Sequence, residues 1–77
     1  MAALIYFKKL SEHDDAIIYA FGDDPSAMSR RLTMNRATRR PQPDDGNMDY
    51  SSLKASRKIN AMYAEADEWP ERGMSAS

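Results

Sequence analysis

The chain has 77 residues, of which 42% are hydrophobic and 30% are charged, a composition typical of one small globular domain near the lower size limit for a self-sufficient core. Eleven Lys and Arg against twelve Asp and Glu leave a formal net charge of −1, so no global field attracts the chain to nucleic acid or to a membrane surface. Cysteine is absent, which excludes disulfides, thiolate metal sites and cysteine nucleophiles and fits a reducing compartment.

The N-terminal residues do not resemble a targeting segment. Residues 1–7 are too short for the apolar region of a secretion signal, have no basic leader, and run directly into Lys8 and Lys9. No stretch approaches the ~18 apolar residues of a membrane span. We therefore predict a cytoplasmic protein that does not bind membranes.

Two apolar stretches, residues 4–10 and 16–21, flank an acidic turn at residues 11–15. Both are rich in β-branched and aromatic residues, which predicts an antiparallel hairpin with strands at 3–10 and 16–22. Apolar residues occupy both faces of each strand, whereas apolar and polar residues alternate along the strands of a sheet that has one solvent-exposed face. Both faces of this hairpin are therefore expected to need cover.

A third strand is predicted at residues 30–36. As a strand, this segment places Leu32 and Met34 on one face. A helix over residues 25–39 would separate the same two side chains onto opposite sides, so the strand is favoured. A single helical turn is expected just before it, at Pro25–Met28.

An amphipathic helix is predicted over residues 51–68. Small or apolar residues recur there at spacings of three and four, with Tyr63 beside them: Ser52, Ala55, Ile59, Met62, Ala66 and Trp69. Asp49 or Ser51 can cap the start of this helix, and Pro70 ends it.

The remaining segments are predicted to be irregular. Residues 37–50 contain prolines, a glycine and almost nothing apolar, which indicates an extended loop, with the third strand able to continue up to Arg40. Residues 71–77 are predicted to form a flexible C-terminal tail. The chain is then one small domain at residues 1–70.

Together these elements predict an α+β domain, a three-stranded antiparallel β-meander with one C-terminal amphipathic helix packed on one face. One helix covers one face only, so the second apolar face, holding Ile5, Phe7 and Ile18, needs cover from residues 37–50 or from another chain. We therefore predict a non-enzymatic interaction protein, a homodimer or a subunit that docks through the sheet face. These three residues are the predicted interface.

An arginine-rich segment provides an alternative site. Five arginines and no acid lie between Met28 and Arg40, at Arg30, Arg31, Arg36, Arg39 and Arg40. Guanidinium groups suit phosphate and carboxylate, so nucleic acid, another anion or an acidic protein could bind here. However, no aromatic residue is interleaved with the arginines, and the acidic residues at 23–24 and 44–45 could pair with them inside the fold. Internal pairing, an acidic protein partner, and nucleic acid or another anion therefore all stay open.

The predicted helix carries its charges in an unusual order. Its first turns are basic, with Lys54, Arg57 and Lys58, and its last turns are acidic, with Glu65, Asp67 and Glu68. Both ends oppose the helix macrodipole. An anion bound at the basic end, an antiparallel partner helix, or screened surface charges of no consequence each account for this order.

No motif in the sequence predicts catalysis, a metal or a cofactor. His13 is the only histidine, and its acidic neighbours in the turn point in different directions, with no second histidine or thiol to complete a metal shell. Asp45, Asn47 and Asp49 match the start of a calcium loop, but the glycine and the bidentate glutamate that such a loop requires are missing. We therefore predict that the protein is not an enzyme.

Short motifs along the chain also carry a family resemblance. The motifs are Asp24-Pro25, then Arg31 and Leu32, and the closing Trp69-Pro70-Glu71-Arg72-Gly73. By these motifs the chain resembles a family of small uncharacterised actinobacterial proteins. In that family a tyrosine-rich hairpin is followed by an Arg-rich strand, a Pro-Asp-Gly loop and a helix that ends in Trp-Pro-Glu-Arg-Gly. The resemblance implies no activity, cofactor or binding residue.

Overall fold

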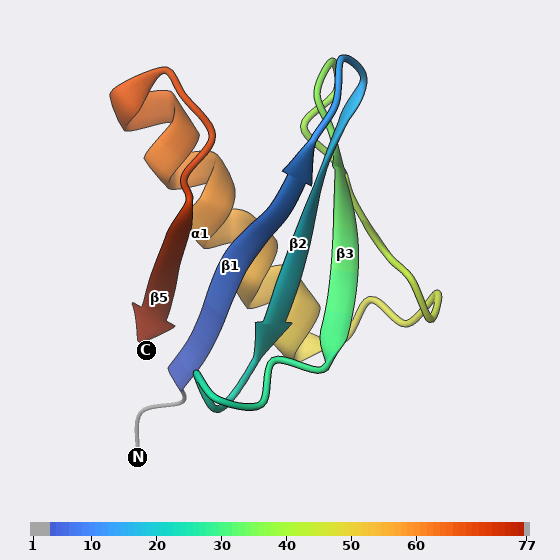
Figure 1. Ribbon diagram of the computed structural model, residues 1–77, viewed down its shortest axis with the longest axis vertical. Coiled ribbons are helices and arrows are strands. Elements are labelled where there is room, and N and C mark those ends of the chain that lie inside the picture. The colour runs from blue at the N-terminus through green and yellow to red at the C-terminus, as the bar shows by residue number, and fades with distance from the viewer. Residues whose placement is uncertain (1–3, 77) are drawn as a thin grey trace.

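A computed structural model describes residues 4–76 as one open antiparallel sheet with a helix across one face (Figure 1). The elements are, in chain order, β1 (Leu4–Glu12), β2 (Ala16–Gly22), β3 (Arg30–Asn35), β4 (Pro41–Pro43), α1 (Tyr50–Ala66) and β5 (Arg72–Ala76). The strand order across the sheet is β4-β3-β2-β1-β5. The α+β class, the single helix and the antiparallel sheet are confirmed, but the sheet has five strands where three were predicted, and a strand follows the helix.

The core lies between α1 and the face of the sheet that α1 covers. Its buried side chains come from alternate positions of β1, β2 and β3, from α1, and from the segment after α1: Ile5, Phe7, Ile17, Tyr19, Phe21, Leu32, Met34, Ala55, Ile59 and Trp69. Alternation along each strand sends these residues to one side, and the helical spacing of Ala55 and Ile59 aligns them against it. Met62 and Tyr63 pack at the margin of this core.

The start of α1 is capped as the sequence predicts, but its end is not. The Asp49 side chain accepts a hydrogen bond from the Ser52 backbone N–H at 3.0 Å, so of the two predicted caps Asp49 is used. The helix stops at Ala66, because Asp67 adopts a left-handed conformation (φ 58°) and its N–H donates to the Tyr63 carbonyl at 2.8 Å. This left-handed cap ends the helix before Pro70 is reached.

The predicted flexible tail is instead a strand for residues 72–76, paired with β1. Two contacts hold the chain in place just before it. Trp69 is 5% exposed and stacks on Tyr63, with ring centroids 4.4 Å apart, and the buried Tyr19 hydroxyl donates to the Pro70 carbonyl at 2.7 Å. Because these contacts fix the chain beside the free edge of β1, even the weakly apolar sequence of β5 pairs there.

The segment predicted as an extended loop contains a tight reversal and the strand β4. The Asn35 side chain accepts hydrogen bonds from the N–H groups of Ala37 and Thr38, both at 2.9 Å, and Arg39 has φ 59°. The chain therefore turns back, and β4 pairs with β3 instead of prolonging it. A local Asx turn and a left-handed residue explain the reversal.

The ends of the hairpin also differ in detail from the prediction. β1 runs to Glu12, two residues further than predicted, with a register irregularity between Lys9 and Ser11. Residue 3, the predicted start of this strand, lies outside the described residues. The predicted helical turn at Pro25–Met28 is a β-turn, in which the Ala27 N–H donates to the Asp24 carbonyl at 3.0 Å.

Candidate interaction surface

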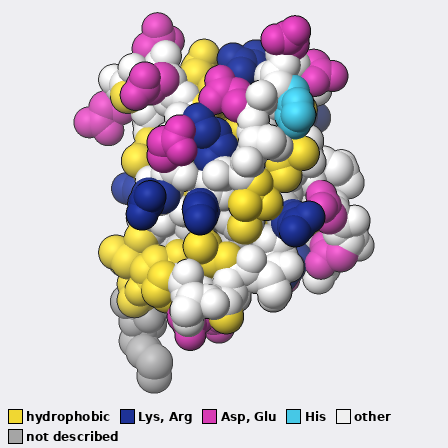
Figure 2. Space-filling view, viewed as in Figure 1, with side chains coloured by type: hydrophobic (Ala, Val, Ile, Leu, Met, Phe, Trp, Pro, Cys, Tyr) yellow, Lys and Arg dark blue, Asp and Glu magenta, His cyan; other side chains and the backbone are white. Residues whose placement is uncertain are grey.

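The face of the sheet that points away from α1 is the candidate site, and we call it the open face. Alternate residues of the strands form it: Leu4, Tyr6, Lys8, Ile18, Arg31, Arg72 and Met74. In Figure 1 the strands lie in front of α1, so Figure 2 shows this face, with basic side chains across its middle and apolar patches beside them. No other element of the described chain lies across it as α1 lies across the opposite face.

The predicted interface of Ile5, Phe7 and Ile18 is divided between the two faces. Ile5 and Phe7 are 3% and 1% exposed and belong to the core under α1. The reason is the strand register, which pairs Phe7 with Phe21 and thereby places both on the face of the helix. Ile18 has the opposite parity and lies on the open face, so the prediction that the three share one surface is wrong.

The loop between β2 and β3 covers one corner of the open face. A Cβ atom placed on Gly22 would lie 3.0 Å from the Ala27 carbonyl oxygen, so the absence of a side chain lets this loop fold closely over the end of β2. Residues 37–50, one of the two predicted covers, do not take this role, because they form β4 and lead into the Asp49 cap of α1. The rest of the open face stays accessible.

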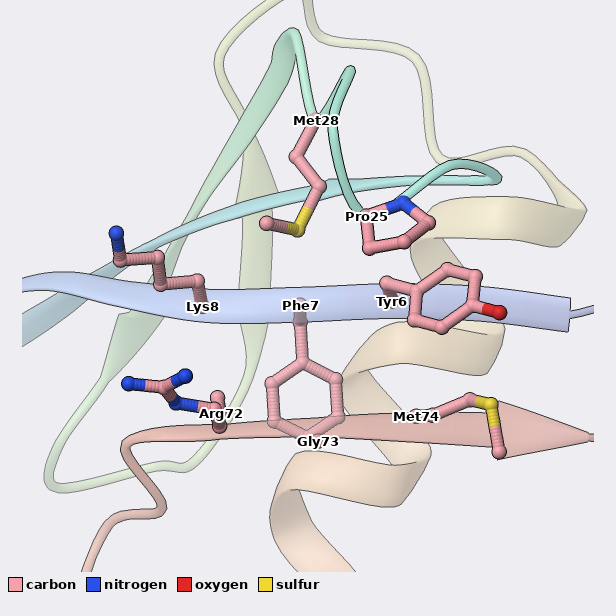
Figure 3. A pocket seen from close by; sticks show the side chains of 8 residues that line it. All are labelled: Tyr6, Phe7, Lys8, Pro25, Met28, Arg72, Gly73 and Met74. Atoms are coloured by element: carbon pink, nitrogen blue, oxygen red, sulfur yellow. The ribbon is translucent and has the colours of Figure 1, made fainter.

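A hollow of about 420 Å³ lies on the open face below this loop. Figure 3 shows its two ends: Lys8 and Arg72 lie at one, and Tyr6 and Met74 at the other. Pro25 and Met28 of the β2–β3 loop form one side. The hollow is therefore basic at one end and apolar at the other, a combination that suits an amphipathic, negatively charged group.

The basic end is formed by like charges directly opposite each other. The register pairs Lys8 with Arg72 on one side and with Ala20 on the other, and Ala20 pairs with Arg31. Directly opposed like charges destabilise a sheet. Within residues 4–76, none of the three cations forms an ion pair. The Lys8–Arg72 pair, which we call the basic pair, is thus left unneutralised by the fold.

The five arginines of residues 30–40 do not form one surface. Arg30 pairs with Asp49 at 2.7 Å and with Asp45 at 3.2 Å, and it also lies over the Phe21 ring. Arg36 pairs with Glu12 at 2.7 Å.

The other three arginines are dispersed. Arg31 is on the open face, Arg39 lies over the Tyr63 ring in the turn before β4, and Arg40 is exposed beside it. Internal pairing thus occupies two of the five, and only Arg31 joins the basic residues of the open face.

A second, polar hollow lies near the end of β1 and holds a network of ion pairs. Lys9 contacts Glu12 at 2.7 Å and Glu71 at 3.1 Å. The hydrogen bond to Glu12 raises the pKa of Lys9, and the bonds from Lys9 and Arg36 lower the pKa of Glu12. Both pKa shifts move away from pH 7, so Lys9 and Glu12 keep their charges at neutral pH and are poorly suited to proton transfer.

His13 and the acidic residues do not assemble a metal site. The His13 Nε2 atom lies 3.1 Å from the Ser11 hydroxyl in the exposed β1–β2 turn. In the part of the chain that the structure describes, no group of three His, Asp or Glu side chains is placed to hold a metal ion. Over the same residues, no helix has the length and hydrophobicity needed to cross a bilayer.

Comparison with protein-family models, with curated proteins and with solved structures gives no match for this chain. The resemblance to the actinobacterial family therefore stays a prediction, and the open face is interpreted from its own residues. Sequence reasoning missed Lys8, Arg72 and Met74 as one site. The sequence showed two adjacent charges, Lys8 and Lys9, inside an apolar strand, but the neighbour of Lys8, Arg72, comes from a strand that was not predicted.

Proposed function

We propose that the protein is a non-enzymatic interaction subunit that binds an acidic, partly apolar segment of another protein on its open face. The observation that carries the proposal is the basic pair, two like charges opposed across β1 and β5 beside an apolar hollow. A carboxylate between Lys8 and Arg72 would relieve their repulsion and accept charge-assisted hydrogen bonds.

Apolar side chains around the basic pair supply the rest of the contact. Met74 is 44% exposed and Leu4 is 38% exposed, and Tyr6 and Ile18 are half-buried. Apolar area removed from water contributes roughly 25 cal/mol per Å² before the costs of association. A partner segment that combines apolar and acidic residues therefore fits this surface better than a purely acidic one.

The same charges disfavour the predicted homodimer through the sheet face. A second copy stacked face to face over the hollow would bring two basic pairs together, and like charges across an interface are repulsive. Nucleic acid is disfavoured for different reasons. Among the residues that define the open face, Tyr6 is the one aromatic side chain on which a base could stack. Two of the five arginines are engaged in ion pairs, and the net charge of −1 gives no overall attraction to phosphates.

Selection from a displayed library of random peptides tests the proposal. We expect the enriched peptides to combine Asp or Glu with large apolar residues and to lose most of their affinity for the Lys8→Glu/Arg72→Glu variant. Lys58→Glu, a charge reversal on the exposed surface of α1, is the matched control and should bind as the wild type does. Enriched peptides that bind the double variant equally well, or no enrichment at all, would overturn the proposal.

A single-stranded oligo-dT probe tests the nucleic-acid alternative. Fluorescence anisotropy should show no binding at physiological salt, because few phosphates could be neutralised and each contact loses affinity as salt rises. Tighter binding of oligo-dT than of any selected peptide would replace a protein partner with a nucleic acid.

A further inference from the structure

The two edges of the sheet differ in their free backbone groups. At β4, the Asn35 N–H donates to the Arg40 carbonyl at 2.9 Å and the Asp44 N–H donates to the Arg31 carbonyl at 3.0 Å. These bonds determine which residues of β4 bond to β3. The backbone N–H and C=O groups of Gln42 point toward β3, and the nitrogens of Pro41 and Pro43 point away from the sheet. Proline has no N–H, so this edge lacks donors at both outward positions and cannot readily accept another strand.

The edge at β5 has no such protection. The Lys9 N–H donates to the carbonyl of the directly opposed Glu71 at 2.7 Å, so Gly73 and Ser75 also exchange hydrogen bonds with β1. The N–H and C=O groups of Arg72, Met74 and Ala76 therefore point away from β1. Since β5 is the last strand of the sheet, these groups face an open edge with no neighbouring strand in the described chain.

We propose that a second copy of this chain covers this edge, with the two β5 strands paired antiparallel about a two-fold axis at Met74. Such an axis opposes Met74 to the partner's Met74 and Arg72 to the partner's Ala76. The outward N–H and C=O groups on both strands then exchange hydrogen bonds in the alternation that an antiparallel ladder requires. Arg72 does not face a second Arg72, so the pairing adds no opposed like charges.

The position of α1 allows the helices to meet about the same axis. Figure 1 shows α1 passing behind β1 so that its C-terminal half lies on the β5 side of the sheet. Met62 lies beside the start of β5, because a Cβ atom on Gly73 would lie 3.2 Å from the Met62 sulfur, and Arg57 lies beside the end of β5, where it lines a hollow with Ser75 and Ala76. Rotation about an axis normal to the sheet places the partner's helix on the same side and antiparallel to α1.

The charge order of α1 becomes complementary in this arrangement. Arg57, Ala61 and Glu65 follow one another at spacings of four on exposed positions of α1, so they lie on one face. An axis near Ala61 opposes Arg57 to the partner's Glu65, and the small Ala61 side chain allows a close approach. Charges that oppose the macrodipole in one chain are then neutralised by the antiparallel helix of the other. Of the three explanations for the charge order, the antiparallel partner helix is the one this dimer uses.

The contact is small, so we expect a weak dimer. β5 has five residues, and the helix contact involves exposed side chains, so the buried area falls in the range of transient interfaces. The dissociation constant is expected to be micromolar rather than nanomolar. This proposal goes beyond the proposed function and does not depend on what the open face binds, because the two-fold axis leaves both open faces accessible on one continuous surface.

Sedimentation equilibrium from low micromolar to near-millimolar concentration tests the dimer. The wild type should move from the mass of one chain to that of two. Met74→Pro removes the central outward N–H and no hydrogen bond to β1, so it should stay monomeric at every concentration. Met74→Thr keeps the N–H and is the matched control, which should dimerise. A wild type that is monomeric throughout, or a Met74→Pro variant that dimerises as the wild type does, would overturn the proposal.

A charge swap on α1 tests the helix contact without altering the strand. Arg57→Glu alone and Glu65→Arg alone should each weaken the dimer several-fold, and the double variant should restore it, because the swapped charges again face opposite partners. If the double variant is as weak as the sum of the single ones, the helices do not meet as proposed. Amide exchange gives a second measurement: the N–H groups of Arg72, Met74 and Ala76 should become protected as concentration rises, and unchanged exchange would count against the paired edge.

Discussion

The two faces of the sheet are made by alternate residues of the same strands, yet only one is closed. On the covered face, Tyr19, Leu32 and Met34 are completely buried beneath α1. On the open face, Leu4 and Met74 remain more than a third exposed, with Lys8 and Arg72 between the apolar patches. A single helix covers only one face of a sheet. The open face has no helix over it, and there charged side chains interrupt the apolar ones. These charges limit the size of any exposed apolar patch.

Truncation of one apolar side chain on each face should give the largest contrast. Leu32→Ala on the covered face is expected to lower the free energy of unfolding by about 2–5 kcal/mol, because the buried side chain leaves a cavity. Ile18→Ala on the open face should cost at most about 1 kcal/mol, since the site stays in contact with water. Urea denaturation of both variants measures the contrast, and equal losses would mean that the open face is packed as a core.

Adjacent residues of β5 offer the next contrast. Gly73 faces the core, where an added Cβ atom would lie 2.6 Å from the Phe7 ring, and Phe7 is only 1% exposed. Gly73→Ala should therefore cost about 1–3 kcal/mol through overpacking. Met74→Ala, one residue along on the open face, should cost a few tenths of a kcal/mol. The midpoint of thermal unfolding distinguishes them, and a Gly73→Ala variant as stable as wild type would show that β5 can move away from β1.

The Tyr19 hydroxyl connects the covered face to the strand that follows the helix. Tyr19→Phe leaves the buried Pro70 carbonyl without its 2.7 Å hydrogen bond, which should cost about 1–2 kcal/mol. Burial also raises the pKa of Tyr19 above the ordinary value of 10.0. The stability that the neutral phenol contributes is therefore complete below pH 10 and is lost as pH rises further, because the unfolded chain ionises first.

An alkaline series of urea denaturations measures this second effect. The wild type should lose stability steeply above about pH 10, and Tyr19→Phe should lose less over the same interval. Parallel curves for the two proteins would indicate that the Tyr19 phenol ionises in the folded state as it does in the unfolded one.

The sequence allowed prediction of the elements with strong local signals. The hairpin, the third strand and the helix follow from β-branched runs and from apolar spacing, and Asp49 was among the predicted caps. What escaped prediction depends on contacts between distant segments. β5 has one large apolar residue, Met74, and forms because Trp69 and Pro70 are anchored in the core, and no local pattern encodes that anchorage.

The register of the hairpin escaped prediction for a similar reason. Both parities of β1 and β2 are apolar, so alternation could not decide whether Phe7 shares a face with Phe21 or with Ile18. A one-residue change of register exchanges the two faces. The basic pair of Lys8 and Arg72 could not be predicted from the sequence, because it depends both on this register and on the unpredicted strand β5.

The smallest predicted effect concerns the basic pair. Lys8→Gln keeps a polar side chain, one atom shorter, but removes one of two opposed like charges, so it should raise the free energy of unfolding by about 0.5 kcal/mol at low salt. The gain should shrink as salt screens the repulsion in the wild type. Arg31→Gln is the control, because Arg31 is paired directly with the neutral Ala20 of β2, and it should give no gain. If Lys8→Gln also weakens binding of an acidic peptide, the pair reduces the stability of the fold in exchange for recognition. A variant that is neither more stable nor weaker in binding would mean that the opposed charges are simply solvated.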